Sequence, residues 1–191
     1  MNKGYGSSSV FLVIPSYNEA SVICDTLAPL IKASYSIVVI DDGSRDETSD
    51  LLKKLPVFVL RHAINLGQGA AIQTGTEFAL KQGAAFIVHF DADGQHQIED
   101  LESLLEPLKN GKADVALGSR FLRKEDAKAV PLSKRYALRL GMFLHGLLSG
   151  LWLTDAHNGL RALTREAAAK IHLHENGYAH ASEIIDQIRR L

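Results

Sequence analysis

Short apolar runs alternate with segments of helical pattern from residue 10 to residue 117, and this alternation restricts the folds open to the chain. Predicted strands lie at 10–14, 36–40, 56–60, 86–90 and 114–117, and predicted helices lie at 19–31, 70–81 and 97–110, with a short one ending at 55. Strands separated by helices at this spacing form βαβ units, in which the strands run parallel with right-handed crossovers. The sequence therefore predicts an α/β fold: a Rossmann-like, mostly parallel sheet flanked by helices.

The size and composition of the chain fit a single globular domain. It has 191 residues, of which 46% are hydrophobic and 23% are charged. The net charge of −1 gives no general attraction to nucleic acid, and the single cysteine, Cys24, excludes an internal disulfide. Residues 1–9 are polar and do not form an export signal. We therefore expect a cytoplasmic protein, with peripheral association at the inner face of the membrane as an alternative.

Two carboxylates follow the fourth predicted strand. Asp91 and Asp93 are two residues apart, so in extended chain they point to the same side and can reach one hard cation. Oxygen ligands of this kind suit Mg²⁺ or Mn²⁺ holding a phosphate-bearing substrate. An isolated Asp-x-Asp is more often a solvated turn, so its surroundings must decide between the two interpretations.

Polar residues also follow the other predicted strands. They occur at 15–19 after the first strand, at 41–42 after the second, around Asn65 after the third and at Arg120 after the fifth. The carboxyl ends of parallel strands gather at one edge of the sheet, where open α/β sheets bind ligands. This convergence favours a nucleotide site over a solvated turn.

A basic segment, residues 120–139, follows the fifth predicted strand. It holds seven basic and two acidic residues, an excess of five positive charges. A predicted helix at 132–153 comes next, too often interrupted by polar residues and glycine to be a good membrane span. It is either a helix that lies on a membrane surface or a core helix with a solvated basic lead-in, and the sequence leaves both open.

The last part of the chain predicts a short strand ending at 163, a helix beginning at 164–166 and a helix over 181–191. His172, His174 and His180 have no firm metal-ligand spacing, so we expect surface histidines.

Six motifs, in this order and spacing, resemble those of the family-2 inverting glycosyltransferases. Within that family they resemble the branch of dolichyl-phosphate mannose synthase and bacterial polyprenyl-phosphate glycosyltransferases. The motifs are Ile-Pro-Ser-Tyr-Asn-Glu at 14–19, Val-Ile-Asp-Asp-Gly-Ser-Arg-Asp-Glu-Thr at 39–48, Asn-Leu-Gly-Gln-Gly-Ala at 65–70, Asp-Ala-Asp-Gly-Gln at 91–95, Gly-Ser-Arg at 118–120 and Asp-Ala-His-Asn-Gly-Leu-Arg at 155–161. Each motif alone is weak, but together they are specific.

The resemblance implies a nucleotide-diphospho-sugar transferase fold of the GT-A type and a UDP- or GDP-linked sugar as donor. The residues it assigns to the nucleotide are Pro15, Tyr17, Asn18, Glu19, Asp42, Asn65, Gly69 and Ala92. It implies that Asp91 and Asp93, with Gln95 close by, hold Mg²⁺ or Mn²⁺ on the diphosphate. Gln68 stands where the family usually has lysine, and we expect Arg61 or Arg120 to supply the missing positive charge.

The resemblance also implies a polyprenyl phosphate acceptor. It points to Asp155 as the residue nearest the acceptor, with Glu183 as a second catalytic candidate. Basic residues expected to meet phosphate are Arg120, Arg135, Arg139 and Arg161. The whole chain, 1–191, would then be one catalytic domain, with a nucleotide-sugar half at about 10–120 and an acceptor half at about 121–191. Because relatives usually extend past the position of Leu191, the chain is expected to be part of a longer protein.

Three other functions compete with this one. The first is a glycosyltransferase that acts on a saccharide acceptor in cell-surface polysaccharide synthesis. The second is a nucleotide-sugar-binding domain without catalytic activity. A dinucleotide-dependent oxidoreductase would need a Gly-x-Gly-x-x-Gly turn after the first strand, and residues 15–19 do not provide one. The sequence does not fix the sugar, the nucleotide or the oligomeric state.

Overall fold

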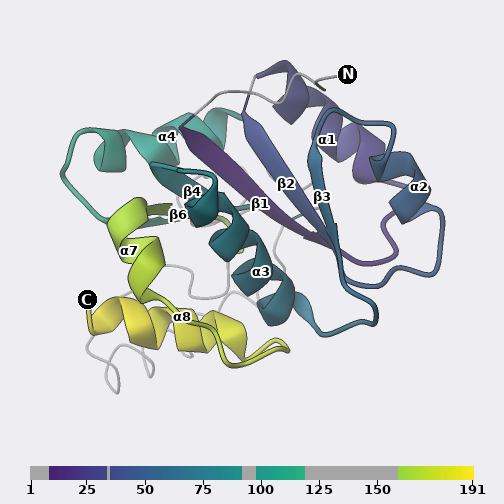
Figure 1. Ribbon diagram of the computed structural model, residues 1–191. Helices are drawn as coiled ribbons and strands as arrows, with labels where there is room; N and C mark the ends of the chain where they lie inside the picture. The colour runs from purple at the N-terminus through teal and green to yellow at the C-terminus, as the bar shows by residue number, and fades with distance from the viewer. Residues whose placement is uncertain (1–8, 34, 92–97, 119–158) are drawn as a thin grey trace, which may run out of the picture.

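The computed structural model describes residues 9–33, 35–91, 98–118 and 159–191, as a sheet with helices on both faces (Figure 1). The strands are β1 (Val10–Ser16), β2 (Ser36–Asp41), β3 (Phe58–Arg61), β4 (Phe86–His89), β5 (Val115–Leu117) and β6 (Arg161–Thr164). The helices are α1 (Ile23–Lys32), α2 (Thr48–Leu52), α3 (Gln68–Lys81), α4 (Ile98–Lys109), α7 (Arg165–Lys170) and α8 (His180–Arg189). The predicted α/β class is confirmed.

The six strands are ordered β3-β2-β1-β4-β6-β5, and β1 to β4 are parallel as predicted. The strand near residue 163 is β6, which is antiparallel to both of its neighbours, β4 and β5. The fifth predicted strand therefore does not pair directly with the fourth. Because β6 runs in the opposite direction, its first residue, Arg161, lies opposite His89 at the edge where β4 ends.

Two apolar layers form the core because side chains along a strand alternate between faces. On one face, Leu12, Ile14 and Val39 pack with residues of α1, α2 and α4. On the other face, Val13 and Ile40 pack with residues of α3, α7 and α8. Helix α3 approaches this second face closely, since a Cβ on Gly75 would lie 2.4 Å from Val13 Cγ1.

The helix predicted at 19–31 begins later, at Ile23. A turn precedes it, in which the N–H groups of Val22 and Ile23 donate to the carbonyl oxygen of Glu19. Gly83 and Gly111 follow α3 and α4 with positive φ angles of 85° and 65°, as expected for residues that end helices. The helix predicted at 132–153 lies outside the described residues.

Candidate nucleotide-sugar site

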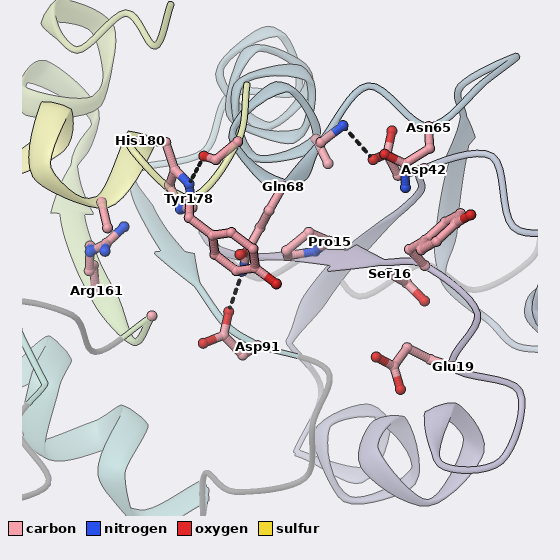
Figure 2. A pocket seen from close by; sticks show the side chains of 16 residues that line it. Pro15, Ser16, Glu19, Asp42, Asn65, Gln68, Asp91, Arg161, Tyr178 and His180 are labelled. Carbon is pink, nitrogen blue, oxygen red and sulfur yellow. Dashed lines mark hydrogen bonds between the residues drawn. The ribbon is translucent and has the colours of Figure 1, made fainter. Parts of the chain in front are cut away.

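A cavity of about 660 Å³ opens at the carboxyl edge of β1, β2 and β4 (Figure 2). Its lining residues are Pro15, Ser16, Tyr17, Glu19, Asp42, Asn65, Gly67, Gln68, Ala71, Asp91, Gly159, Arg161, Gly177, Tyr178, His180 and Ala181. The parallel strands bring the lining residues that follow β1, β2 and β4 to one edge of the sheet. Antiparallel β6 brings Arg161 to the same edge. The cavity therefore joins the strand-end loops to the last 33 residues of the chain, 159–191.

Asp42 is buried at the end of β2 and holds the loop that follows β3. Its Oδ1 accepts the N–H of Leu66 at 2.9 Å and pairs with Nδ1 of His62 at 2.7 Å. Its Oδ2 accepts the N–H of Gly67 at 2.7 Å. Nε2 of His62 lies 3.0 Å from Oγ1 of Thr74 in α3. Since a carboxylate oxygen has two lone pairs, Oδ2 keeps one acceptor position for a ligand.

The loop after β1 forms the same end of the cavity. Pro15, Tyr17 and Glu19 line it as predicted, and Tyr17 is 39% exposed. Asn18 instead fastens this loop to the one after β2, because its N–H donates to Oγ of Ser44 and its Oδ1 accepts the N–H of Arg45. Its left-handed backbone, with φ of 57°, suits asparagine. Asn18 therefore shapes the loop without lining the cavity.

Asp91 is half-buried in the middle of the lining. Its Oδ1 accepts an N–H from Gln68 Nε2 at 3.0 Å. The backbone of Gly159 is so close that a Cβ there would overlap the Asp91 carboxylate. This anionic oxygen donor at a strand end fits a hard cation such as Mg²⁺ or Mn²⁺. The other predicted ligands, Asp93 and Gln95, lie outside the described residues, as does Ala92.

Arg161 supplies a buried positive charge on the side of the cavity that lies away from Asp42 (Figure 2). It is 2% exposed, and its Nη1 has no hydrogen-bond partner within the described part of the chain. Burial lowers the pKa of Arg161, and the charge of Asp91 opposes that shift. Burial also lowers the pKa of nearby His89 to about 3, which keeps that ring neutral. An anion in the cavity would therefore meet an unshared guanidinium N–H.

Arg61, expected to place a cation near the phosphates, points elsewhere. Its guanidinium donates to Oγ of Ser49 and to the carbonyl oxygen of Ser44, and its Nε lies 3.5 Å from Oδ2 of Asp41. Arg61 does not line the cavity, so its placement gives no support to this role. Arg120, the other residue named for that role, lies outside the described residues.

His180 corrects the prediction of three surface histidines. It is 4% exposed at the start of α8 and lines the cavity, whereas His172 and His174 are exposed. Nδ1 of His180 lies 2.7 Å from the carbonyl oxygen of Gly177. Burial lowers the pKa of His180. The sequence did not reveal this, because the spacing of three histidines does not show which of them faces inward.

Glu183 does not line the cavity. Its carboxylate accepts the N–H groups of His174 and Glu175 at 2.9 to 3.0 Å, and it lines a separate cavity beside α8. This placement gives no support to the predicted catalytic role of Glu183.

The structure thus brings together seven of the predicted residues: Pro15, Tyr17, Glu19, Asp42, Asn65, Asp91 and Arg161. Gly69 is not among the lining residues, and its N–H donates to the carbonyl oxygen of Asn176. Four other predicted residues, Asp155, Arg120, Arg135 and Arg139, lie outside the described residues. Sequence reasoning missed Gly177, Tyr178 and His180, which form the wall of the cavity that precedes and begins α8. The Asn-Gly pair at 176–177 does mark a turn at the start of this wall.

Comparisons with known proteins agree with this geometry. Residues 11–172 match glycosyl transferase family 2. The chain is 43% identical over 180 residues to an uncharacterised protein of Methanocaldococcus jannaschii, covering 92% of this chain and 74% of that protein. It is 34% identical over 177 residues to the UDP-N-acetylglucosamine--dolichyl-phosphate N-acetylglucosaminyltransferase of Methanococcus voltae, covering 83% of this chain and 70% of that enzyme.

A solved structure shares the fold. Glucosyl-3-phosphoglycerate synthase from Mycobacterium tuberculosis, crystallised with Mn²⁺, UDP and phosphoglyceric acid, superposes with a TM-score of 0.69 at 22% identity. The match covers 97% of this chain and 66% of that one. This chain thus has the fold of the GT-A glycosyltransferases. Within its described residues, no helix has the length and apolar character needed to span a membrane.

Proposed function

This chain belongs to glycosyl transferase family 2, and from that premise we propose that it transfers a sugar from a nucleotide sugar to a polyprenyl phosphate, with inversion at the anomeric carbon. One observation carries the proposal: a single cavity is lined by the predicted nucleotide residues at one end and by buried Arg161 at the other. The relative from Methanococcus voltae, named for transfer to dolichyl phosphate, supports the choice of acceptor.

The nucleotide would lie along the ends of β1 and β2. Tyr17 is exposed enough to stack on a base, and Oδ2 of Asp42 can accept one N–H or hydroxyl. Because His62, Leu66 and Gly67 already fix this carboxylate, it does not need to reorganise when the nucleotide binds. Such preorganisation reduces the free-energy cost of binding.

A divalent cation would be held by Asp91, together with the Asp93 and Gln95 that the resemblance assigns to it. When bound, such a cation neutralises charge on the diphosphate as it leaves. The chain's own contribution is to keep Asp91 in place through the Gln68 hydrogen bond and the contact with Gly159.

In the transfer step, an oxygen of the acceptor phosphate forms a bond to the anomeric carbon. The bond from that carbon to the diphosphate breaks on the opposite face, and the nucleoside diphosphate leaves with its electron pair. A phosphate monoester has a second pKa of about 6, so it is largely ionised at neutral pH and needs little help from a base. Arg161 is suited to hold it, because a guanidinium matches phosphate oxygens.

This acceptor places the reaction at a membrane surface. A polyprenyl phosphate has an anionic head and an apolar tail, and the basic segment followed by apolar residues would meet them in that order. Each basic residue near anionic lipid contributes about 1 kcal/mol, so association should weaken with salt.

Thermal unfolding with UDP- and GDP-linked sugars, with and without Mn²⁺, tests the donor side of the proposal. A nucleotide sugar should raise the unfolding temperature of the wild type in a metal-dependent way. Asp91→Ala should lose the metal-dependent part while remaining folded. If Asp91→Ala binds UDP and GDP as tightly as the wild type does, with and without metal, the metal assignment is wrong.

Arg161 tests the acceptor side. Arg161→Lys keeps a positive charge but removes the planar fork, and it should reduce transfer while preserving binding of the nucleotide sugar. Equal loss of donor binding and of transfer would assign Arg161 to the nucleotide instead.

A further inference from the structure

The backbone of the segment 172–176 is hydrogen-bonded mainly by side chains, where a β-strand would be hydrogen-bonded by a neighbouring strand. Gln187 of α8 accepts the N–H of His172 and also donates to the carbonyl oxygen of His172. Gln73 of α3 accepts the N–H of Leu173 at 2.9 Å. Glu183 accepts the next two N–H groups, those of His174 and Glu175. Four successive backbone N–H groups are therefore satisfied by α3 and α8, which fixes the path of the segment.

The end of this segment packs tightly against the start of α3. The N–H of Gly69 donates to the carbonyl oxygen of Asn176 at 2.8 Å. A Cβ on Gly69 would lie 2.0 Å from the carbonyl oxygen of Glu175, so the two backbones approach as closely as a glycine allows. The chain then turns at Gly177 and enters α8 at His180, where the three residues Gly177, Tyr178 and His180 line the cavity.

Tyr178 belongs to the cavity lining, and yet its side chain is exposed, with a relative exposure of 90% for the residue. Figure 2 shows its ring projecting from the segment just before α8, on the side of the cavity where His180 lies, towards Gln68 and Asp91 in the middle of the cavity. An aromatic ring provides a large apolar contact face with only two side-chain torsions to fix. Such a face, in a cavity that also holds Asp91 and Arg161, is suited to a ligand that has both an apolar face and polar edges.

The order of groups along the cavity indicates which part of the donor reaches Tyr178. The nucleoside lies towards Asp42 in the proposed function, and the diphosphate lies at Asp91. The sugar, attached beyond the diphosphate, then falls on the side of Tyr178 and Arg161. A pyranose ring has C–H groups on its faces and hydroxyl groups around its edge, which matches an exposed aromatic ring.

We propose that Tyr178 packs against the sugar of the bound nucleotide sugar, and that Glu183 is the positioning residue that holds the 172–176 segment so that Tyr178 stays in the cavity lining. This inference rests on the proposed function. It gives Glu183 a role through the backbone of His174 and Glu175, in place of contact with the reacting atoms.

The test compares two affinities for each variant of the full chain in the presence of Mn²⁺: that for UDP-N-acetylglucosamine, UDP-glucose or GDP-mannose, and that for UDP or GDP alone. Tyr178→Ala should weaken binding of the nucleotide sugar about three- to tenfold and leave the nucleoside diphosphate unchanged. Tyr178→Phe keeps the ring and should behave as the wild type. The quantity compared is the ratio of the affinity for the nucleotide sugar to the affinity for the nucleoside diphosphate. If this ratio is the same in Tyr178→Ala as in the wild type, the contact with the sugar is overturned.

Glu183→Gln places an amide against two backbone N–H groups and should shift the ratio in the same direction as Tyr178→Ala. Asp186→Asn, an exposed carboxylate on the same helix, is the matched control and should leave the ratio unchanged. A lower unfolding temperature with an unchanged ratio would show that Glu183 has a structural role only. Loss of turnover with an unchanged ratio would show a direct catalytic role, and either result would overturn the positioning role.

The outcome for the wild type separates this inference from the proposed function. If the wild-type chain binds none of these nucleotide sugars, the proposed function fails, and the inference fails with it. If the wild type binds one of them and the Tyr178 ratio does not move, only the inference fails.

Discussion

Gln68 donates an N–H to Oδ1 of Asp91 at 3.0 Å, joining the first residue of α3 to the carboxylate that follows β4. The resemblance leads us to expect a lysine at position 68, and a neutral amide there has a consequence. It can orient the Asp91 carboxylate without neutralising it, so the full negative charge stays available to a cation.

This contact predicts that Gln68→Lys weakens metal binding. A lysine ammonium would pair with Asp91 and compete with the cation, lowering Mn²⁺ affinity about two- to fivefold, as expected for a partly exposed ion pair. Gln68→Glu adds a carboxylate and should shift the affinity the other way. Calorimetric titration of Mn²⁺ in the presence of UDP or GDP measures both. Equal affinity in the two variants would show that position 68 does not act on the cation.

Asp42 should contribute to stability as well as to nucleotide binding. Asp42→Ala leaves the N–H groups of Leu66 and Gly67 without their acceptor, which we expect to lower the free energy of unfolding by about 1–3 kcal/mol. Nucleotide binding should weaken by a similar amount, on the order of 1–3 kcal/mol, with metal dependence intact. Urea unfolding and calorimetry measure the two effects. Asp50→Ala, which removes an exposed ion pair with Lys53, is the control. Wild-type nucleotide affinity in Asp42→Ala would remove Asp42 from the site.

Gly69 should tolerate no side chain. Gly69→Ala would place a Cβ 2.0 Å from the carbonyl oxygen of Glu175 and 2.8 Å from Cβ of His180, so the segment before α8 must move. We expect a lower unfolding temperature and weaker binding of nucleotide sugars. Gly177→Ala is the matched control for the unfolding temperature, because a Cβ there meets nothing within 4 Å. Similar unfolding temperatures of the two variants would mean that this close packing does not stabilise the fold.

The Glu183 carboxylate predicts a dependence of stability on acid pH. Burial raises its pKa, but the N–H groups of Glu175 and His174 outweigh this, and the pKa of Glu183 is lowered overall. A group whose pKa is lower in the folded state stabilises the fold above its unfolded pKa, about 4.3 for glutamate, and loses this contribution as pH falls through the folded value.

The difference in stability between the wild type and Glu183→Gln should therefore be constant at neutral pH and shrink below about pH 4. Urea unfolding across this range measures it. A difference that grows as pH falls would contradict the assigned contacts of Glu183.

The apolar runs were sufficient to predict the parallel strands and the edge where Asp42 and Asp91 meet, because strand direction and strand ends follow from βαβ connections. The reversed direction of β6 was not predictable in the same way, because a helix is predicted at 132–153 before it and a helical connection usually joins parallel strands. The sequence also could not show that Arg161 and His180 are buried or that Arg61 pairs with Asp41. Such partners depend on which side chains the finished packing brings together. The segment 172–176 is a further example, because glutamine and glutamate side chains replace the strand partner that a sequence pattern would reveal.

Transfer of a labelled sugar by the full chain with Mn²⁺ tests the central claim most directly. Short polyprenyl phosphates in detergent and soluble saccharides are offered as acceptors, with UDP- and GDP-linked sugars as donors. Product on the polyprenyl phosphate, and none on the same polyprenol without its phosphate, is the predicted result. Efficient transfer to a soluble saccharide with no product on polyprenyl phosphate would contradict it.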